Sequence, residues 1–101
     1  MATTPKALFR GAATTVLTTT LYTVPALTNT VVTNIVVTNT AAAAATYDLS
    51  LDGVKVGALV AIAANSIAVI DMKQVLATTK IIAGGASAIT VNFHISGAEL
   101  T

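Results

Sequence analysis

Four residues in the middle of the chain have types and spacing that could bind a calcium ion. The first, third, fifth and sixth positions of the calcium-loop pattern D-x-[DN]-x-[DN]-G-x5-E are held by Asp48, Ser50, Asp52 and Gly53. The third position is a serine, however, and the twelfth is Leu59, where a bidentate glutamate closes the coordination shell. We therefore expect a hairpin here rather than a metal site, since Asp-Gly between β-rich runs favours a type I′ turn.

The remaining residues with reactive side chains are too few and too scattered for catalysis. His94 is the single histidine and the chain has no cysteine, so a zinc site would need three ligands from four carboxylates. Gly84-Gly85 has no lysine after it to hold a phosphate. Asp71 close to Lys73 is typical of a local cap or of a surface ion pair. We predict no catalytic residue, no metal and no cofactor, and we expect that the protein is not an enzyme.

The composition excludes several classes of protein. The chain has 101 residues, of which 54% are hydrophobic and only 9% are charged, so it does not resemble a disordered segment. Its net charge is +1 and its cations are scattered, so we expect no nucleic-acid partner. The longest apolar stretch, residues 57–70, is interrupted by Asn65-Ser66 and is shorter than the roughly 20 residues of a membrane helix. We expect neither a membrane span nor a cleaved signal.

Small uncharged side chains dominate the surface that this composition must produce. The chain contains 18 threonines and 20 alanines, so these two residues make up more than a third of it. A surface with so little charge keeps copies of a protein apart poorly. We therefore expect that other protein chains cover part of this surface, and the alternative is a monomer with a Thr-, Asn- and Ala-rich surface.

Apolar and β-branched runs alternate with turn residues along most of the chain. The runs predict strands at residues 14–24, 30–40, 46–52, 54–56, 58–62, 67–70, 79–83 and 87–96. We expect a connection at 41–45, one helical turn at 71–76 and a loop at 84–85. This pattern predicts an all-β fold, an antiparallel β-sandwich of seven to eight short strands with jelly-roll or immunoglobulin-like topology. We expect one sandwich domain over residues 14–101, preceded by an N-terminal arm over residues 1–13.

Three of these strands have patterns that assign side chains to faces. Residues 30–40 repeat Val-Val-Thr-Asn after five positions, and an odd repeat moves each residue to the opposite face of a regular strand. The alternation therefore predicts one face with Val31, Ile35 and Val37 and another with Val32 and Val36. In the other two strands the predicted inward residues are Tyr47, Leu49 and Leu51, and Ile89, Val91, Phe93 and Ile95; the predicted outward residues are Asp48, Ser50 and Asp52, and Thr90, Asn92, His94 and Ser96.

An ordered series of short motifs resembles a class of virion proteins. The motifs are Leu21-Tyr-Thr-Val-Pro25, Val31-Val-Thr-Asn-Ile-Val-Val-Thr-Asn-Thr40, Leu49-Ser-Leu-Asp-Gly53, Ile62-Ala-Ala-Asn65, Ile82-Ala83 and Val91-Asn-Phe-His-Ile-Ser-Gly-Ala-Glu99. Together they resemble the small structural proteins of tailed-bacteriophage virions over about residues 21–99. The sequence departs from that pattern at Leu27, where glycine is frequent, and at Ala63-Ala64, which replace a proline-containing turn.

The resemblance implies a β-sandwich that binds other virion proteins. On that basis we expect a capsid decoration (cement) protein on the virion surface, with the major capsid protein or another virion protein as partner, and a homo-oligomer in which a trimer is favoured. A cement protein binds only the assembled shell, so its binding stabilises the shell by linkage. The alternatives are a head–tail connector, tail or fibre component and, from another class, a surface carbohydrate-binding module, which would present exposed aromatic residues.

Overall fold

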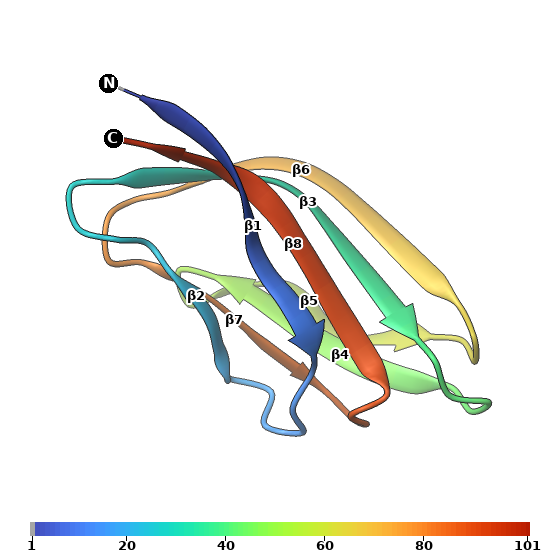
Figure 1. Ribbon diagram of the computed structural model, residues 1–101. Helices are drawn as coiled ribbons and strands as arrows, with labels where there is room; N and C mark the ends of the chain where they lie inside the picture. The colour runs from blue at the N-terminus through green and yellow to red at the C-terminus, as the bar shows by residue number, and fades with distance from the viewer. Residues whose placement is uncertain (1) are drawn as a thin grey trace.

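The computed structural model describes residues 2–101, which form eight β-strands and, within that range, no helix. The strands are β1 (Thr3–Ala12), β2 (Thr20–Thr23), β3 (Asn29–Asn39), β4 (Ala45–Leu51), β5 (Val54–Ile62), β6 (Ile67–Leu76), β7 (Ile81–Ala86) and β8 (Val91–Leu100). They make two four-stranded antiparallel sheets, with strand orders β1-β8-β3-β6 and β2-β7-β4-β5. The predicted all-β sandwich is confirmed (Figure 1).

The strand pairing shows which kind of sandwich this is. β4 pairs with β5, β3 with β6, β2 with β7 and β1 with β8, so the chain forms one long hairpin whose two halves run antiparallel. Two further pairings, β3 with β8 and β4 with β7, join the rolled hairpin into sheets. This nested arrangement is the jelly-roll topology. It brings the ends of the chain together, since the backbones of Ala2 and Thr101 exchange two hydrogen bonds of 2.8 and 2.9 Å.

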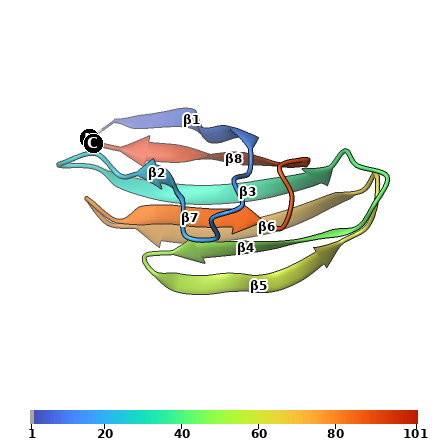
Figure 2. The ribbon, with the colours of Figure 1, turned by 90° about the horizontal axis from the view of Figure 1, so that it is seen from below.

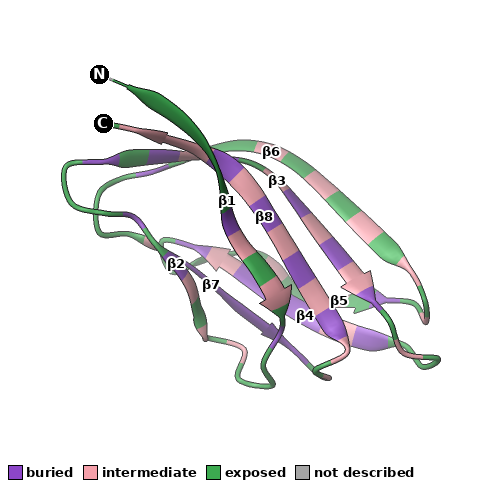
Figure 3. Cartoon of the chain, viewed as in Figure 1, coloured by how far each residue is buried: buried purple, intermediate pink, exposed green. Residues whose placement is uncertain are grey.

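The core lies between the two sheets and consists of aliphatic side chains with a few aromatic rings. Its largest fully buried members are Phe93, Ile35, Leu49, Ile82 and Ile95. The ring of Tyr47 meets that of Phe93 edge to face, with centroids 6.2 Å apart. Alternating burial along β3 and β8 places Ile35, Phe93 and Ile95 inward (Figure 3). The inward positions predicted for Tyr47, Leu49 and Leu51 are confirmed, and so are those of Val91, Phe93 and Ile95.

The hairpin that closes the roll is the one predicted from Asp52-Gly53. Leu51 and Val54 pair directly, and the two turn residues have φ angles of +54° and +74°. Both residues have the left-handed backbone conformation that a type I′ turn requires, and glycine adopts this conformation without a steric penalty. The turn at residues 63–66 is also confirmed, but the strands on either side of it belong to different sheets.

The predicted faces of β3 are wrong at one end because the strand contains a bulge. Its pairing with β8 passes from Val32–Gly97 to Asn34–Ser96, so Thr33 is an extra residue relative to β8. On the other side, β6 has two residues, Met72 and Lys73, opposite Thr33. The bulge changes the phase of the alternation, and Val32 joins Ile35 and Val37 in the core while Val31 turns outward. Val32 and Val37 occupy equivalent positions of the five-residue repeat, and a regular strand would place them on opposite faces. Because Thr33 is an extra residue, they point to the same face, and both are fully buried.

The segment 1–13, expected as an arm, is mostly a strand of the chain's own sheet. Residues 3–12 form β1 and pair with β8, while Met1 lies outside the described residues. The pattern of this strand is weak because it lies at a sheet edge and buries only Leu8 fully. Pro5 and the charged residues Lys6 and Arg10 are tolerated there, since an edge strand needs hydrogen bonds on one side only. The sheet therefore begins before residue 13.

Several other boundaries differ from the predictions. Residues 14–19 form a turn instead of a strand, stabilised where the N–H and Oγ1 of Thr19 donate to the carbonyl of Val16. Residues 71–76 continue β6 instead of forming a helical turn, because polar side chains are accommodated on the solvent face of an edge strand. Ile89, predicted to face inward, lies in the turn before β8 and is 69% exposed. The predicted loop at Gly84-Gly85 is instead a buried part of β7.

The two glycines of β7 allow other chain segments to approach closely. A Cβ atom on Gly84 would overlap the carbonyl oxygen of Asp48, and one on Gly85 would overlap that of Val16. β7 can therefore pack against β4 and the turn at residues 14–19 only with glycine at both positions.

Candidate protein-binding surfaces

One end of the sandwich carries no charged residue in any of its loops. The four connections β1–β2, β3–β4, β5–β6 and β7–β8 lie there, at residues 13–19, 40–44, 63–66 and 87–90. They contain only Ala, Thr, Ser, Asn, Val, Leu and Ile, and Val16 and Ile89 are 61% and 69% exposed. We call these four loops the uncharged end. The absence of charge, together with two exposed aliphatic side chains, suits contact with another protein surface.

Asn39 fixes three of these loops relative to one another. Its side chain is 2% exposed, and its amide nitrogen donates to the carbonyls of Ala43 at 2.8 Å and Ala63 at 3.3 Å. Its amide oxygen accepts from the N–H of Ala41 at 3.1 Å and from the hydroxyl of Thr90 at 3.3 Å. One buried amide therefore holds the shape of the uncharged end, and a preformed surface loses less entropy on binding.

A second polar cluster joins the sheets at the opposite end, near the chain termini. The hydroxyl of Tyr22 donates to the Glu99 carboxylate at 2.5 Å and lies 2.9 Å from the hydroxyl of Thr30. Lys6 lies 3.3 Å from the same carboxylate. The bond from Tyr22 and then the charge of Lys6 lower the pKa of Glu99, while burial and the bond to Glu99 raise the pKa of Tyr22. This cluster connects β1, β2, β3 and β8 and has a structural role.

Asp48 was predicted to face solvent but is buried on the outer side of β4. Its carboxylate bonds to Lys55 and accepts the backbone N–H of Leu59 at 2.9 Å. The Lys55 ammonium and then the Leu59 N–H hold the pKa of Asp48 below its ordinary value. The rest of the candidate calcium set is dispersed, since Ser50 bonds a backbone carbonyl and Asp52 lies 3.7 Å from Lys80. Asp48 therefore stabilises the β4–β5 pair.

The side of the sandwich formed by β5 and β6 exposes most of its apolar side chains. β6 ends one sheet and β5 ends the other, and β5 forms a border of the molecule in Figure 2. Six aliphatic residues on these strands are 45–69% exposed: Val54, Val56, Leu59, Ile67, Val69 and Val75. Natural proteins normally cover exposed apolar side chains on strands at free sheet edges. We call this surface the β5–β6 side.

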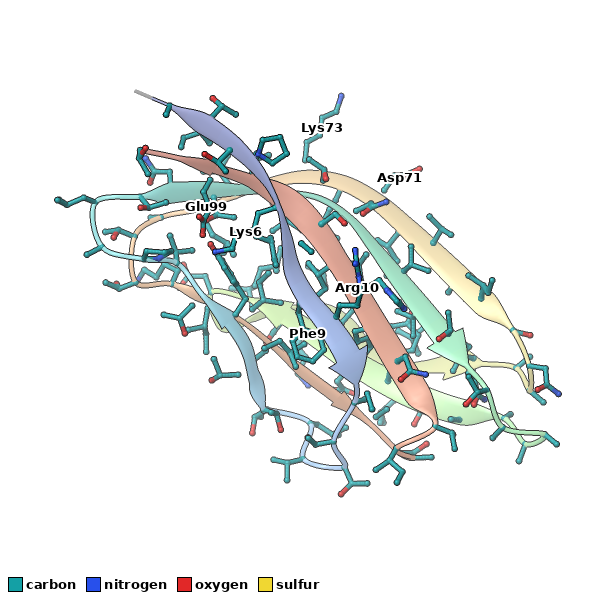
Figure 4. All side chains as sticks on the ribbon, in the orientation of Figure 1. Lys6, Phe9, Arg10, Asp71, Lys73 and Glu99 are labelled. Carbon is teal, nitrogen blue, oxygen red and sulfur yellow. The ribbon has the colours of Figure 1, made fainter. Side chains whose placement is uncertain are left out.

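Three charged residues lie outside the ion pairs of residues 2–101. The three pairs there are Lys6–Glu99, Lys55–Asp48 and Lys80–Asp52, which leaves Arg10, Asp71 and Lys73. Arg10 is exposed on β1, at one edge of its sheet, and the other two are exposed on β6 at the opposite edge (Figure 4). A shallow hollow of about 430 Å³ beside β6 is lined by Thr33, Asp71, Met72 and Lys73. The ion pair predicted between Asp71 and Lys73 does not form.

The structure does not assemble a reactive site from the other residues with candidate chemistry. His94 is half-buried in the middle of β8, opposite Arg10 on one side and Val36 on the other. In residues 2–101 no three side chains of the metal-binding types gather in one place, and no helix is long and apolar enough to cross a membrane. Tyr22, Tyr47 and Phe93 are buried and Phe9 is half-buried, so the described surface has no fully exposed aromatic ring.

A comparison with protein-family models found no matching family, and a comparison with curated proteins found no match.

Proposed function

We propose that this protein is a non-enzymatic structural protein of a tailed-bacteriophage virion, and that it decorates the capsid. In this role it binds the major capsid protein of the assembled head as a homo-oligomer and stabilises the shell, because it binds the assembled state only. The uncharged end is the surface that contacts the shell.

The observation that carries this proposal is the rigid uncharged end. Asn39 holds its loops in place, Val16 and Ile89 project from it, and the flanking side chains are small. Such a surface offers no group for chemistry and little to attract a charged ligand, whereas it suits close packing on a protein. The ordered motifs that resemble phage virion proteins supply the identity of the partner, and jelly rolls are frequent among capsid proteins.

A head–tail connector, tail or fibre component is the second candidate, because the same surface would serve at any of these positions. A carbohydrate-binding module receives less support from the structure. Sugars stack on exposed aromatic rings, and the four aromatic side chains of this protein contribute to the interior or lie against it.

Copy number in purified virions separates these functions. Quantitative mass spectrometry would count this chain against the major capsid protein. A ratio near one, or near a simple fraction such as one-third, is the expected result for a decoration protein. A ratio of a few per cent would place the protein in the neck, tail or fibres, and its absence from virions would overturn the proposal.

Two substitutions test the uncharged end directly. Val16→Asp and Ile89→Asp each place a charge on that end, and each should abolish co-sedimentation of the purified protein with virions that lack it. Leu27→Asp is the matched control, because Leu27 is 93% exposed at the opposite end of the sandwich. If all three variants bind equally, the uncharged end is not the contact surface.

A further inference from the structure

We propose that the β5–β6 side of one molecule binds the β1–β2 side of a second copy of this chain, head to tail. In this arrangement β6 pairs with β1 of the next copy, and β5 lies beside β2 of that copy. The inference concerns contacts between copies and holds whether or not the protein is part of a virion.

The directions of the strands allow both pairings at once. Neighbouring strands are antiparallel throughout each sheet, so the first and last strands of each four-stranded sheet run in opposite directions. When a second copy in the same orientation is placed alongside, β6 therefore meets β1 antiparallel, and β5 meets β2 antiparallel. Both sheets continue from copy to copy without a change of pattern.

The two sides also match in shape. β1 is exposed along most of its length at one side of the sandwich, and β5 is exposed along most of its length at the other (Figure 3). β1 belongs to the sheet that ends in β6, whereas β5 belongs to the sheet that begins with β2. The sheet that contains β1 therefore extends farther on the β1–β2 side, and the sheet that contains β5 extends farther on the β5–β6 side (Figure 2). When two copies lie side by side, each projecting sheet fits over the recessed edge of the other copy.

Two of the three charges outside the ion pairs, Asp71 and Arg10, supply the complementarity that commits the surface to a copy of this chain. Asp71 is exposed on β6, and Arg10 is exposed on β1 and faces the outer side of the same sheet. An antiparallel register that sets Asp71 opposite Arg10 of the next copy gives each carboxylate a guanidinium partner. The hollow lined by Thr33, Asp71, Met72 and Lys73 provides space for that guanidinium.

Pairing of two β1 edges is disfavoured by charge. β1 carries Lys6 and Arg10 and no acidic residue, so two β1 strands would bring cations together. A heterologous contact of this kind closes into a ring when the rotation between copies permits it, and a trimer is one such ring.

The size of the contact fits an association of modest strength. At about 3.3 Å per residue, the ten-residue strands β1 and β6 span some 30 Å, whereas the four-residue strand β2 spans some 13 Å. With each layer about 10 Å thick, the contact covers about 400 Å² per copy, about half of the roughly 800 Å² that each partner buries in a standard interface. The six exposed aliphatic residues of β5 and β6 would supply its apolar part.

Charge exchange between the two edges tests this inference on the purified protein. Light scattering coupled to gel filtration should show a wild-type oligomer, and Arg10→Glu and Asp71→Arg should each reduce the association at least tenfold. The double variant, which carries both changes, should recover it. An equimolar mixture of the two single variants should also associate, because each supplies the edge that the other lacks.

Lys80→Glu is the control, since it makes the same change of charge in the β6–β7 loop, outside the strands that pair in this contact, and should leave the oligomer unchanged. A wild-type monomer at millimolar concentration would overturn the inference. So would a double variant that stays monomeric while its circular dichroism remains that of the folded protein. Copy number in virions is measured separately, so failure here is distinguishable from failure of the proposed function.

Discussion

Asp48 Oδ1 accepts the backbone N–H of Leu59 at 2.9 Å, at the point where β5 contains two residues opposite one of β4. The pairing shifts there from Tyr47–Val60 to Leu49–Gly57, which removes the Leu59 N–H from the ladder, and Leu59 has a φ of +48°. The carboxylate replaces the missing carbonyl acceptor. Asp48, which occupies the first position of the calcium-loop pattern, therefore stabilises a β-bulge.

We expect the protein to lose stability in acid through Asp48 and Glu99. Both carboxyls have a folded-state pKa below the ordinary value, the first because of Lys55 and the Leu59 N–H, the second because of Tyr22 and Lys6. Their contribution is complete above the unfolded pKa of about 4 and disappears as the pH falls below that value through the folded pKa. Urea unfolding between pH 7 and pH 2 measures it. In Asp48→Asn the free energy of unfolding should fall less between pH 7 and pH 2. An unchanged pH dependence would contradict this role of Asp48.

Tyr22→Phe should destabilise the protein by about 1–2 kcal/mol. It removes the hydrogen bonds to Glu99 and Thr30 and leaves a partly buried carboxylate with one partner fewer. Tyr47→Phe is the control, because the pKa of Tyr47 is raised by burial alone and its hydroxyl makes no hydrogen bond within residues 2–101. Denaturant melts should show a change below about 0.5 kcal/mol for the control. Equal losses in the two variants would mean that the hydroxyl of Tyr22 contributes nothing.

Asn39→Ala should cost about 2–3 kcal/mol, because it removes two donated and two accepted hydrogen bonds from a buried position. Hydrogen exchange should also become faster in the loops at 40–44, 63–66 and 87–90. Asn34→Ala on the same strand is the control, since Asn34 is half-buried on the outer face. Unchanged exchange at the uncharged end would show that Asn39 does not hold these loops together.

Gly84→Ala should be more damaging than its one added methyl group suggests. The new Cβ would overlap the carbonyl of Asp48 and the side chain of Leu49, so β4 and β7 would have to separate. We expect a loss of about 3 kcal/mol, which is roughly 12–24 °C in melting temperature for a domain of this size. Gly11→Ala, where the nearest atom is the Phe9 ring at 3.5 Å, should change the melting temperature little. Similar melting of the two variants would contradict the close approach.

The sequence predicted those features of the fold that depend on local pattern. The all-β class, the hairpin at Asp52-Gly53 and the inward row of β4 follow from period-two alternation and turn chemistry. The choice of jelly roll did not follow, because it depends on pairings such as β1 with β8 that lie almost a whole chain apart. No local signal encodes such pairings.

The errors share a physical origin in backbone irregularity and in strand position. The extra residue Thr33 reverses the phase of β3, and alternation alone does not show where a bulge lies. The five-residue repeat was the available signal of a bulge in β3. Equivalent valines five residues apart can both be buried only if one extra residue lies between them. β1 and β6 were misread because edge strands have polar and charged residues on exposed positions. The glycines of β7 looked like a loop because their packing partners are distant in sequence.

The sequence predicted the chemical character of the candidate surfaces but not where they lie on the fold. Low charge and small side chains indicated protein contacts, but the gathering of four uncharged loops at one end is a product of the topology. The placement of Arg10 and Asp71 at opposite edges of one sheet likewise appears only after the strand order is known.

The paired ends of the chain have a practical consequence. Because Ala2 and Thr101 are hydrogen-bonded to each other, and β1 leads from them toward the uncharged end, both termini leave the molecule side by side at the far end (Figure 1). A peptide or protein fused to either terminus would project away from the uncharged end. A short linker could join the termini and allow the chain to be reopened at another turn. The fold is thus a natural scaffold for displaying cargo while the uncharged end stays accessible.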